Sequence, residues 1–402
     1  MASQLLGRER RDFWMLSVGQ LLIFCGFYAF FQFPLYIKAL GGAEQAIGII
    51  MGVTALAATL LMPWIIALVD RIERKALMLA GVCLVELATM ACVVTTSPGV
   101  LMGALMMARG LGFAVYMIAS GAYLAQIMPP EEKSRWIGVN LGFNQVAIGL
   151  GPLIGELVIH QVNFPYFFFV SAALVYSGML LLLPISARAP VPPPVPFRAM
   201  DSLVGFFAEL AGPRFRNTFL TLLLMAGALG AVFNFTATYT QLLGLSSGLF
   251  FATYALTNAA TRFGAGGLAD RYGRTLVVVP TLVMFGAGIY VFSVTQGTLV
   301  MLVAAVLIGV GFALPNPAIF ALMLDRAPPR LQGMAVGGFH FAYQLGLLSS
   351  PPLFGVIAER WGYAPMWWIA GAMALGAIGP YLLPELRAGA AGERSARISD
   401  AE

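Results

Sequence analysis

Long apolar runs, separated by short polar or charged stretches, occupy most of this chain. A helix needs roughly 20 apolar residues to cross the ~30 Å hydrocarbon core of a bilayer, and these runs are of that length. The pattern therefore predicts twelve transmembrane helices and leaves no room for a sizeable soluble domain. Their expected ranges are 13–38, 45–69, 75–96, 99–128, 134–159, 163–185, 214–243, 247–269, 275–294, 298–325, 332–358 and 363–384.

One segment breaks this pattern. Residues 186–213 begin with a proline-rich, stiff connector and continue with apolar residues at helical spacing. We predict a short amphipathic helix there, which lies on the membrane surface or packs against a neighbouring loop. The predicted organisation is an N-terminal six-helix bundle (1–185), a cytoplasmic linker (186–213), a C-terminal six-helix bundle (214–386) and a disordered cytoplasmic tail (387–402).

Composition agrees with a membrane protein. Apolar residues make up 59% of the chain and charged residues only 10%, far from the soluble average. The formal charge of +5 has its source in loop arginines, so we expect no nucleic-acid partner. The three cysteines lie inside apolar runs, and neither they nor the histidines have zinc-site spacing. We expect no metal and no cofactor.

The basic residues predict the orientation of the chain. Of 23 Lys and Arg residues, 19 lie in the termini, the linker and alternate loops, which marks that side as cytoplasmic. Lys38 and Arg360 fall on the opposite side, and Arg109 and Arg262 fall inside predicted helices. An even number of spans then places both termini in the cytoplasm.

A charged loop recurs in the two halves. Residues 66–75 (IALVDRIERK) and 266–275 (GGLADRYGRT) lie 200 positions apart, each after two predicted helices. Pro152 and Pro352 repeat at the same offset. Such coincidences at one offset indicate an internal duplication, and duplicated helical bundles around a central cleft are typical of secondary transporters.

These motifs resemble those of the major facilitator superfamily. Residues 266–274 are similar to its cytoplasmic loop signature, Arg109 and Gly112 to its helix-4 arginine motif, and Gly151 and Pro152 to the helix-5 motif of its exporters. The resemblance implies an all-α membrane fold, with twelve helices in two pseudo-symmetric six-helix bundles. It is greatest to bacterial sugar-efflux and drug-efflux permeases, which implies a multi-pass protein of the bacterial inner membrane.

The repeated loops are expected to control opening. An aspartate at the end of one helix accepts hydrogen bonds from the next helix, and arginines meet carbonyl ends. Glycine and proline in helix 5 allow close packing and bending. The alternative is that these residues only fix the topology, a tight turn and static packing. The predicted gating residues are Asp70, Arg71, Asp270, Arg271, Arg274, Gly151 and Pro152.

Four ionisable residues lie inside predicted helices, where charge is costly. Arg109 is expected to stabilise a carboxylate during proton release or to pair with an anionic substrate, the alternative being a tie between helices. Glu156 and Glu86 are the proton-coupling candidates, because burial favours the protonated form. Alternatively, Glu156 lies in a wet external position and Glu86 belongs to the scaffold. Arg262 is a weaker candidate, because it can extend toward the cytoplasm.

Polar residues on helices 5 and 11 form a predicted binding site. Asn140 and Asn144 match His340 and Gln344 at the 200-residue offset, so two polar stripes are expected to face each other. Inter-helix hydrogen bonding is the alternative role for each residue. The predicted substrate-binding residues are Tyr28, Gln32, Arg109, Asn140, Asn144, Asn234, Tyr254, Asn258, His340, Tyr343 and Gln344.

These features predict a monomeric secondary active transporter that moves a small organic solute by alternating access, with proton-coupled efflux as the favoured direction. Its partners are the solute, protons and membrane lipid. The alternatives are uptake of an organic anion by symport or exchange, and a non-transporting receptor or scaffold. No lysine follows a glycine as in an ATP-binding loop, and the Gly-x-Ser-x-Gly pattern at 244–248 lies in a predicted helix–helix loop, so no enzyme is predicted.

Overall fold

The computed structural model describes residues 2–69, 71–128, 133–187, 205, 207–265, 268, 272–328 and 331–383, and within these ranges the chain forms helices and no strand. The helices of the first half are α1 (Ala2–Tyr28), η1 (Ala29–Gln32), α2 (Phe33–Ala39), α3 (Glu44–Val69), α4 (Arg74–Ala91), η2 (Cys92–Val94), α5 (Val100–Ile127), α6 (Lys133–Gln161) and α7 (Phe164–Leu182). The helices of the second half are α9 (Arg216–Leu242), α10 (Ser247–Ala265), α12 (Arg274–Ser293), α13 (Thr298–Ala313), α14 (Pro315–Arg326), α15 (Gln332–Trp361) and α16 (Tyr363–Gly376).

Eleven helical segments of the described chain are long and apolar enough to cross a membrane. The remaining crossing is α10, whose 19 residues span about 28 Å, enough for the hydrocarbon core. Polar residues in its second half, including Asn258 and Arg262, lower its hydropathy. The twelve predicted helices are therefore present, and the least apolar one lies between the two halves.

Two crossings are broken where the sequence pattern predicts one continuous helix. In the first crossing, the 3₁₀ segment η1 separates α1 from α2. In the tenth, Leu314 separates α13 from α14, because Pro315 stands at the first position of α14 and cannot donate the hydrogen bond that a continuous helix needs. Both breaks leave backbone carbonyls available to other groups.

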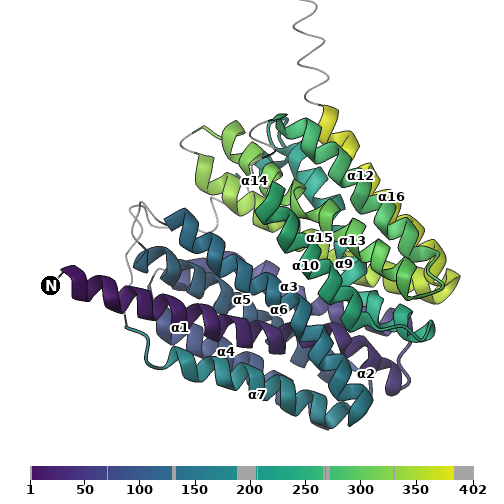
Figure 1. Cartoon of the computed structure of the whole chain (residues 1–402), viewed down its shortest axis with the longest axis horizontal. Helices are drawn as coiled ribbons and strands as arrows, with labels where there is room; N and C mark the ends of the chain where they lie inside the picture. Colours follow the sequence, from purple (N-terminus) through teal and green to yellow (C-terminus); the bar gives the residue numbers. More distant parts are fainter. Residues whose placement is uncertain are drawn as a thin grey trace, which may run out of the picture.

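The two halves pack by the same rules. In the first half α4 and α3 pack on α5, and α1 packs on α6 and α7; in the second half α12 and α10 pack on α13, and α9 packs on α15 and α16. The halves join where α3 meets α15 and where α10 meets α6. Figure 1 shows the two bundles side by side, in purple to teal and in green to yellow. The predicted fold of two pseudo-symmetric six-helix bundles is thus confirmed.

The linker helix packs against the second half where it is described. Residues 207–211 are helical, and Leu210 is only 4% exposed, with its side chain beside Gly338 of α15. The ring of Phe207 lies 5.4 Å from that of Phe341 on the same helix. Residues 201–204 and 206 of the predicted linker helix lie outside the described residues, and so does the predicted disordered tail 387–402.

Helix pairs within each half approach closely at glycines. A Cβ atom added to Gly110 of α5 would lie 1.7 Å from the carbonyl oxygen of Thr54 on α3. Gly81 of α4 and Gly112 of α5 meet in the same way, each with the other's carbonyl oxygen within 3 Å of an added Cβ. Small residues at such crossings are how membrane helices pack without a hydrophobic driving force.

We expect Gly110→Ala to destabilise the protein by about 1–3 kcal/mol, because the methyl group forces α3 and α5 apart. Thermal unfolding in detergent, followed by tryptophan fluorescence, measures this change. The control is Gly121→Ala on the same helix, where an added Cβ meets nothing within 4 Å. Equal midpoints for the two variants would show that this crossing does not constrain the bundle.

Candidate functional site

The two halves meet at the end of the bundle opposite the N-terminus, which we call the far end. It carries the connections at residues 40–43, 161–163, 243–246 and 362. The opposite end, which carries the N-terminus and the loop before α4, is the near end. The hydrogen bonds described below between the halves run from the far end toward the middle of the helices.

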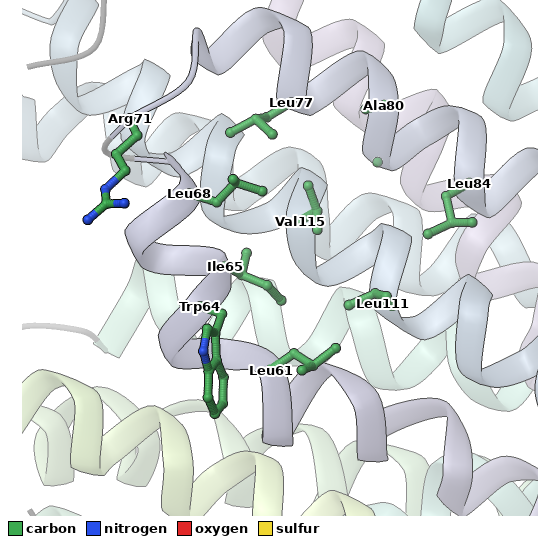
Figure 2. Close-up of a pocket in the computed structure, with 11 residues that line it drawn as sticks. Leu61, Trp64, Ile65, Leu68, Arg71, Leu77, Ala80, Leu84, Leu111 and Val115 are labelled. Carbon is green, nitrogen blue, oxygen red and sulfur yellow. The ribbon is translucent and has the colours of Figure 1, made fainter. Parts of the chain in front are cut away.

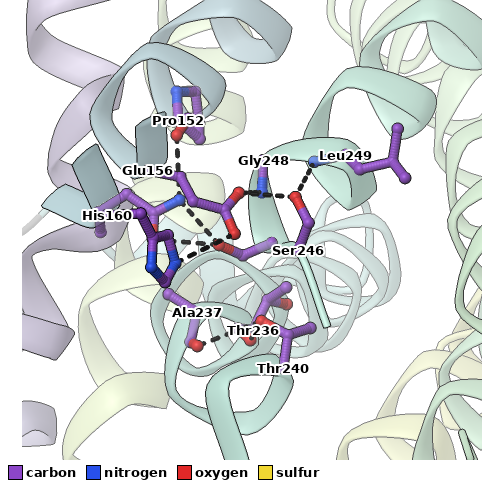
Figure 3. A network of polar contacts seen from close by, with 11 residues as sticks. Pro152, Glu156, His160, Thr236, Ala237, Thr240, Ser246, Gly248 and Leu249 are labelled. Carbon is purple, nitrogen blue, oxygen red and sulfur yellow. Dashed lines mark hydrogen bonds and ion pairs between the residues drawn. The ribbon is translucent and has the colours of Figure 1, made fainter. Parts of the chain in front are cut away.

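A carboxylate of the first half binds the start of a helix in the second half. Glu156 of α6 is only 7% exposed, and its Oε2 accepts hydrogen bonds from the Ser246 hydroxyl (2.7 Å) and the Gly248 backbone N–H (2.5 Å). Ser246 also caps α10, because its Oγ accepts the Leu249 N–H at 3.0 Å. Figure 3 shows this network, with His160 Nε2 3.8 Å from Glu156 Oε1. A negative charge is favoured there, because unpaired N–H groups and the helix dipole converge at a helix N-terminus.

A second contact of the same kind links the halves in the reverse sense. The Oε2 atom of Glu359 on α15 accepts a hydrogen bond of 2.9 Å from the backbone N–H of Gln45, at the start of α3. Glu44 beside it pairs with Lys38 and accepts a 3.4 Å hydrogen bond from the Tyr363 hydroxyl. Each half thus contributes one carboxylate to a helix start in the other half. Sequence reasoning missed Glu359, which lies in an exposed last turn rather than inside an apolar run.

Gln32 and Pro152 lie just inside the Glu156 contact. The Gln32 amide donates to the Pro152 carbonyl (3.0 Å) and exchanges hydrogen bonds with the Ser247 hydroxyl of the second half (2.8 and 3.0 Å). Gly151 packs against the α1 backbone, where an added Cβ would lie 2.6 Å from the Cys25 carbonyl oxygen. The proline and glycine therefore fit α6 closely to the broken part of the first crossing.

Aromatic rings form the next layer toward the middle. The ring of Phe31 lies 4.8 Å from that of Phe233 and 5.1 Å from that of Phe251, so one ring of the first half packs against two neighbouring rings of the second. Phe233 in turn lies 5.9 Å from Tyr254. This layer separates the polar contacts of the far end from the polar groups deeper in the bundle.

Several predicted binding residues come together below this layer. Asn144 donates to the Tyr28 hydroxyl at 3.3 Å, and the phenol groups of Tyr28, Tyr254 and Tyr343 lie close enough to interact electrostatically. Asn258 accepts a 2.9 Å hydrogen bond from Gln145 across the two halves. The cluster therefore draws residues from α1, α6, α10 and α15.

Sequence reasoning missed Gln145 and undervalued Arg262. Gln145 follows Asn144 directly and therefore points about 100° away around α6, toward α10 rather than α1. Arg262 acts electrostatically on both Tyr254 and Tyr343, so it belongs to the same cluster. The available signal was helical spacing, since Tyr254, Asn258 and Arg262 follow one another every four residues.

Other predicted binding residues lie elsewhere. Asn140, a member of one predicted polar stripe, donates to Ser17 and Gln20 of α1 (3.1 Å each) inside the first half. Asn234 donates to the Gly230 carbonyl of its own helix at 2.7 Å. His340 is exposed and packs near the rings of Phe320 and Phe339, while Gln344 is partly buried on α15.

Arg109 is enclosed by the first half. Its side chain is 1% exposed and donates to the carbonyl oxygens of Phe27 (2.9 Å) and Gly26 (3.4 Å) and to the Thr89 hydroxyl (3.2 Å). The guanidinium carbon also lies 3.5 Å from the centre of the Phe30 ring. These carbonyls come just before the 3₁₀ segment, so Arg109 supports the break in the first crossing.

Glu86 lies on α4 in the same region. It is 5% exposed, and both carboxylate oxygens are buried without a hydrogen-bond partner among the described residues. Its nearest charge partner in electrostatic terms is Arg109. Glu86 is therefore separated from the contact between the halves, whereas Glu156 is part of it.

The loop arginines tie helices within each half. Arg274 of α12 forms an ion pair with Asp325 at the end of α14. Arg74, at the equivalent position of the first half, donates to Gln126 (2.6 Å) and to the Ala122 carbonyl (3.1 Å) near the end of α5. Asp70, Asp270 and Arg271, the other predicted gating residues of these loops, lie outside the described residues.

Arg71 stands at the near end of an apolar pocket of about 530 Å³ between α3, α4 and α5 (Figure 2). Its lining belongs entirely to the first half and includes Leu61, Trp64, Leu84 and Leu111. Among the described side chains that line the pocket, Arg71 is the only charged one. The pocket is thus distinct from the cluster between the halves that contains Tyr28, Tyr254 and Tyr343.

Two halves of six helices, joined around a polar cluster in the membrane, define a multi-pass membrane transport protein. The sequence model of the Major Facilitator Superfamily matches residues 16–345 and 245–398. The chain therefore belongs to the major facilitator superfamily, and it is a secondary transporter of small molecules rather than an enzyme.

Relatives and solved structures agree with this assignment. The staphylopine export protein of Staphylococcus aureus is 22% identical over 353 residues, covering 85% of this chain and 88% of the relative. The quinolone resistance protein NorA of the same species is 26% identical over 162 residues, 40% of each chain. The nucleoside transporter NupG has the same fold, with a TM-score of 0.72 at 14% identity, over 92% of this chain and 99% of that one.

Substitutions of the two intramembrane arginines are expected to differ strongly in their effect on stability. We expect Arg109→Gln to cost about 3–5 kcal/mol, because it leaves Glu86 without its charge partner and removes hydrogen bonds to Gly26, Phe27 and Thr89. Arg262→Gln should stay within about 0.5 kcal/mol, because this side chain makes no hydrogen bond to the described residues. Thermal unfolding of both purified variants checks this, and equal losses would contradict the assigned roles.

Proposed function

We propose that this transporter exports a small organic compound in exchange for protons, by alternately opening its two ends. The observation that carries the proposal is the buried contact between Glu156 and the start of α10, which joins the halves at the far end. The distribution of basic residues supports an external far end. In the described structure this end is closed by polar contacts and by the aromatic layer of Phe31, Phe233 and Phe251.

Glu156 supplies the proton sensitivity in this proposal. Its carboxylate accepts hydrogen bonds from the Gly248 N–H and the Ser246 hydroxyl at the N-terminus of α10. Protonation from outside removes that charge and weakens the contact, so the far end opens where cargo is released. His160 lies at 3.8 Å on the exposed side and offers a route for the proton. Glu86, enclosed with Arg109, serves the scaffold.

The cargo site is proposed to lie at the cluster between the halves. Tyr28, Asn144, Tyr254, Asn258 and Tyr343 present hydroxyl and amide groups from four helices. Phe31, Phe233 and Phe251 add aromatic surface toward the far end. A site of this kind suits a partly apolar organic molecule with a few polar groups.

Gating at the near end is assigned to the loops that follow α3 and α10. Arg74 and Arg274 keep each half rigid by tying α4 to α5 and α12 to α14. Each half then moves as a unit, which is what rocking between two open states requires. The direction of transport is supported by the relatives, which include an export protein and a quinolone resistance protein.

The far-end contact can be tested by distance measurements. We expect Glu156→Gln to shift the equilibrium toward an open far end by roughly 10- to 100-fold, because a charge-assisted hydrogen bond is worth about 1.5–3 kcal/mol. Spin labels at residues 162 and 243, one on each half, report the separation in nanodiscs. In the wild-type protein, acidification should lengthen this distance, and in Glu156→Gln the distance should not respond to pH.

Two further variants sharpen this test. Glu359→Gln should produce a smaller shift, because that carboxylate is exposed. Glu209→Gln, exposed and remote from the far end, should produce none. Identical distance distributions for Glu156→Gln and the wild type at every pH would refute the gating role.

Transport itself is tested in proteoliposomes with an imposed pH gradient and a compound panel that includes a quinolone. The wild-type protein should accumulate at least one compound against its gradient when protons flow the opposite way. Glu156→Gln should retain exchange but lose proton-driven accumulation. Full accumulation by this variant would remove Glu156 from the coupling mechanism.

A further inference from the structure

Arg262, a cation of the cluster between the halves, forms no ion pair with any carboxylate that the structure describes. Arg262 lies on α10, one turn beyond Asn258 and two turns beyond Tyr254, so the three share one face of the helix. The Asn258 side chain reaches Gln145 of the first half at 2.9 Å, which shows that this face is turned toward the contact between the halves. The position of Arg262 is thus fixed by the same stripe that forms the cluster.

Arg262 is partly exposed, but the Nε atom of its guanidinium is buried and unsatisfied among the described residues. No described carboxylate forms an ion pair with Arg262. The other helix arginines differ: Arg109 binds two carbonyls and a hydroxyl, Arg274 pairs with Asp325, and Arg326 donates to Thr218 at 2.9 Å. An unpaired cation inside a membrane bundle is costly, so it marks a place where a partner arrives from outside the chain.

The described neighbours of Arg262 are hydrogen-bond donors and carry no negative charge. Its charge acts on the phenol groups of Tyr254 and Tyr343, and Tyr28 lies within electrostatic range of both. Phenol hydroxyls donate hydrogen bonds to anions. Two buried carboxylates of the described helices have other partners. Glu86 interacts with Arg109. Glu156 binds the backbone N–H of Gly248, which lies about 21 Å from Arg262 along α10.

We propose that Arg262 binds an anionic group of the cargo, a carboxylate attached to an aromatic or otherwise apolar body, with Tyr254 and Tyr343 as additional donors. The planar guanidinium matches a carboxylate in two parallel hydrogen bonds. The apolar body faces the aromatic layer of Phe31, Phe233 and Phe251. This inference rests on the proposed transport function and names its substrate class. It also transfers the anion-binding role from Arg109, whose Nε and Nη2 groups are already hydrogen-bonded inside the first half, to Arg262.

Binding to the purified full-length protein in nanodiscs tests the inference. The probes are aromatic carboxylates such as biphenyl-4-carboxylate and 2-naphthoate, each paired with its neutral methyl ester, and the readouts are thermal stabilisation and tryptophan quenching. We expect the acids to bind the wild-type protein roughly 10- to 100-fold more tightly than the esters, as expected for a hydrogen-bonded charge pair. In Arg262→Gln this preference should disappear, and in Arg262→Lys part of it should remain.

A matched control is Arg216→Gln, which removes an exposed arginine of the same half and should keep the preference. Equal binding of acids and esters to the wild-type protein would overturn the proposal, and so would an unchanged preference in Arg262→Gln. Proteoliposome flux separates the two proposals. If proton-driven transport of neutral compounds is unaffected by Arg262→Gln, the proposal of an anionic cargo is refuted and the proposed transport mechanism is retained. If the protein binds acids more tightly than esters through Arg262 but transports neither, the proposed transport mechanism is refuted and the anion site is retained.

Discussion

A carboxylate in one half reaches the first backbone N–H groups of a helix in the other half only because glycine lets the two helices touch. At Gly248 an added Cβ would lie 2.8 Å from the Cα of Leu153 and 2.5 Å from the Glu156 carboxylate. At Gly48, its equivalent 200 positions earlier, an added Cβ would lie 2.2 Å from the Pro351 carbonyl oxygen. The Glu156 contact, the Gln32–Ser247 pair and the aromatic layer all depend on this approach.

The same structure shows two ways of placing arginine inside a membrane bundle. The Nε and Nη2 groups of Arg109 bind Thr89 and backbone carbonyls next to a 3₁₀ segment, and aromatic rings pack on the guanidinium, so Arg109 stabilises a helix break. Arg262 has the opposite character, because its buried Nε has no hydrogen-bond partner in the described part of the chain. Hydrophobicity and depth, which made Arg109 the stronger candidate in the sequence, do not distinguish a satisfied cation from an unsatisfied one. The hydrogen-bond partners around each arginine make this distinction.

Much of the fold was predictable because the bilayer imposes it. Apolar run length gives the number of crossings, and the 200-residue repeat gives two equivalent bundles. The predicted residues Tyr28, Asn144, Tyr254, Asn258 and Tyr343 do come together, since each is polar within an apolar run and has to face protein.

Helix rotation was not predictable from these rules. Asn144 faces α1 while its neighbour Gln145 faces α10, and a single sequence does not reveal which of two adjacent polar residues points across the halves. Asn140 turns into the first half for the same reason. Glu359 was missed because its role comes from a helix start that lies 314 positions away in the chain.

The polar face of α10 has a consequence for how the protein is made. Arginine and other polar residues disfavour entry of a segment into lipid from the translocon, and α10 carries Arg262 in its last turn together with Asn258 and several threonines. We therefore expect α10 to leave the translocon together with an adjoining apolar segment, such as α9 or α12, and not as an independent unit. The residues assigned to cargo would then be assembled late in biogenesis, after their more hydrophobic neighbours have entered the bilayer.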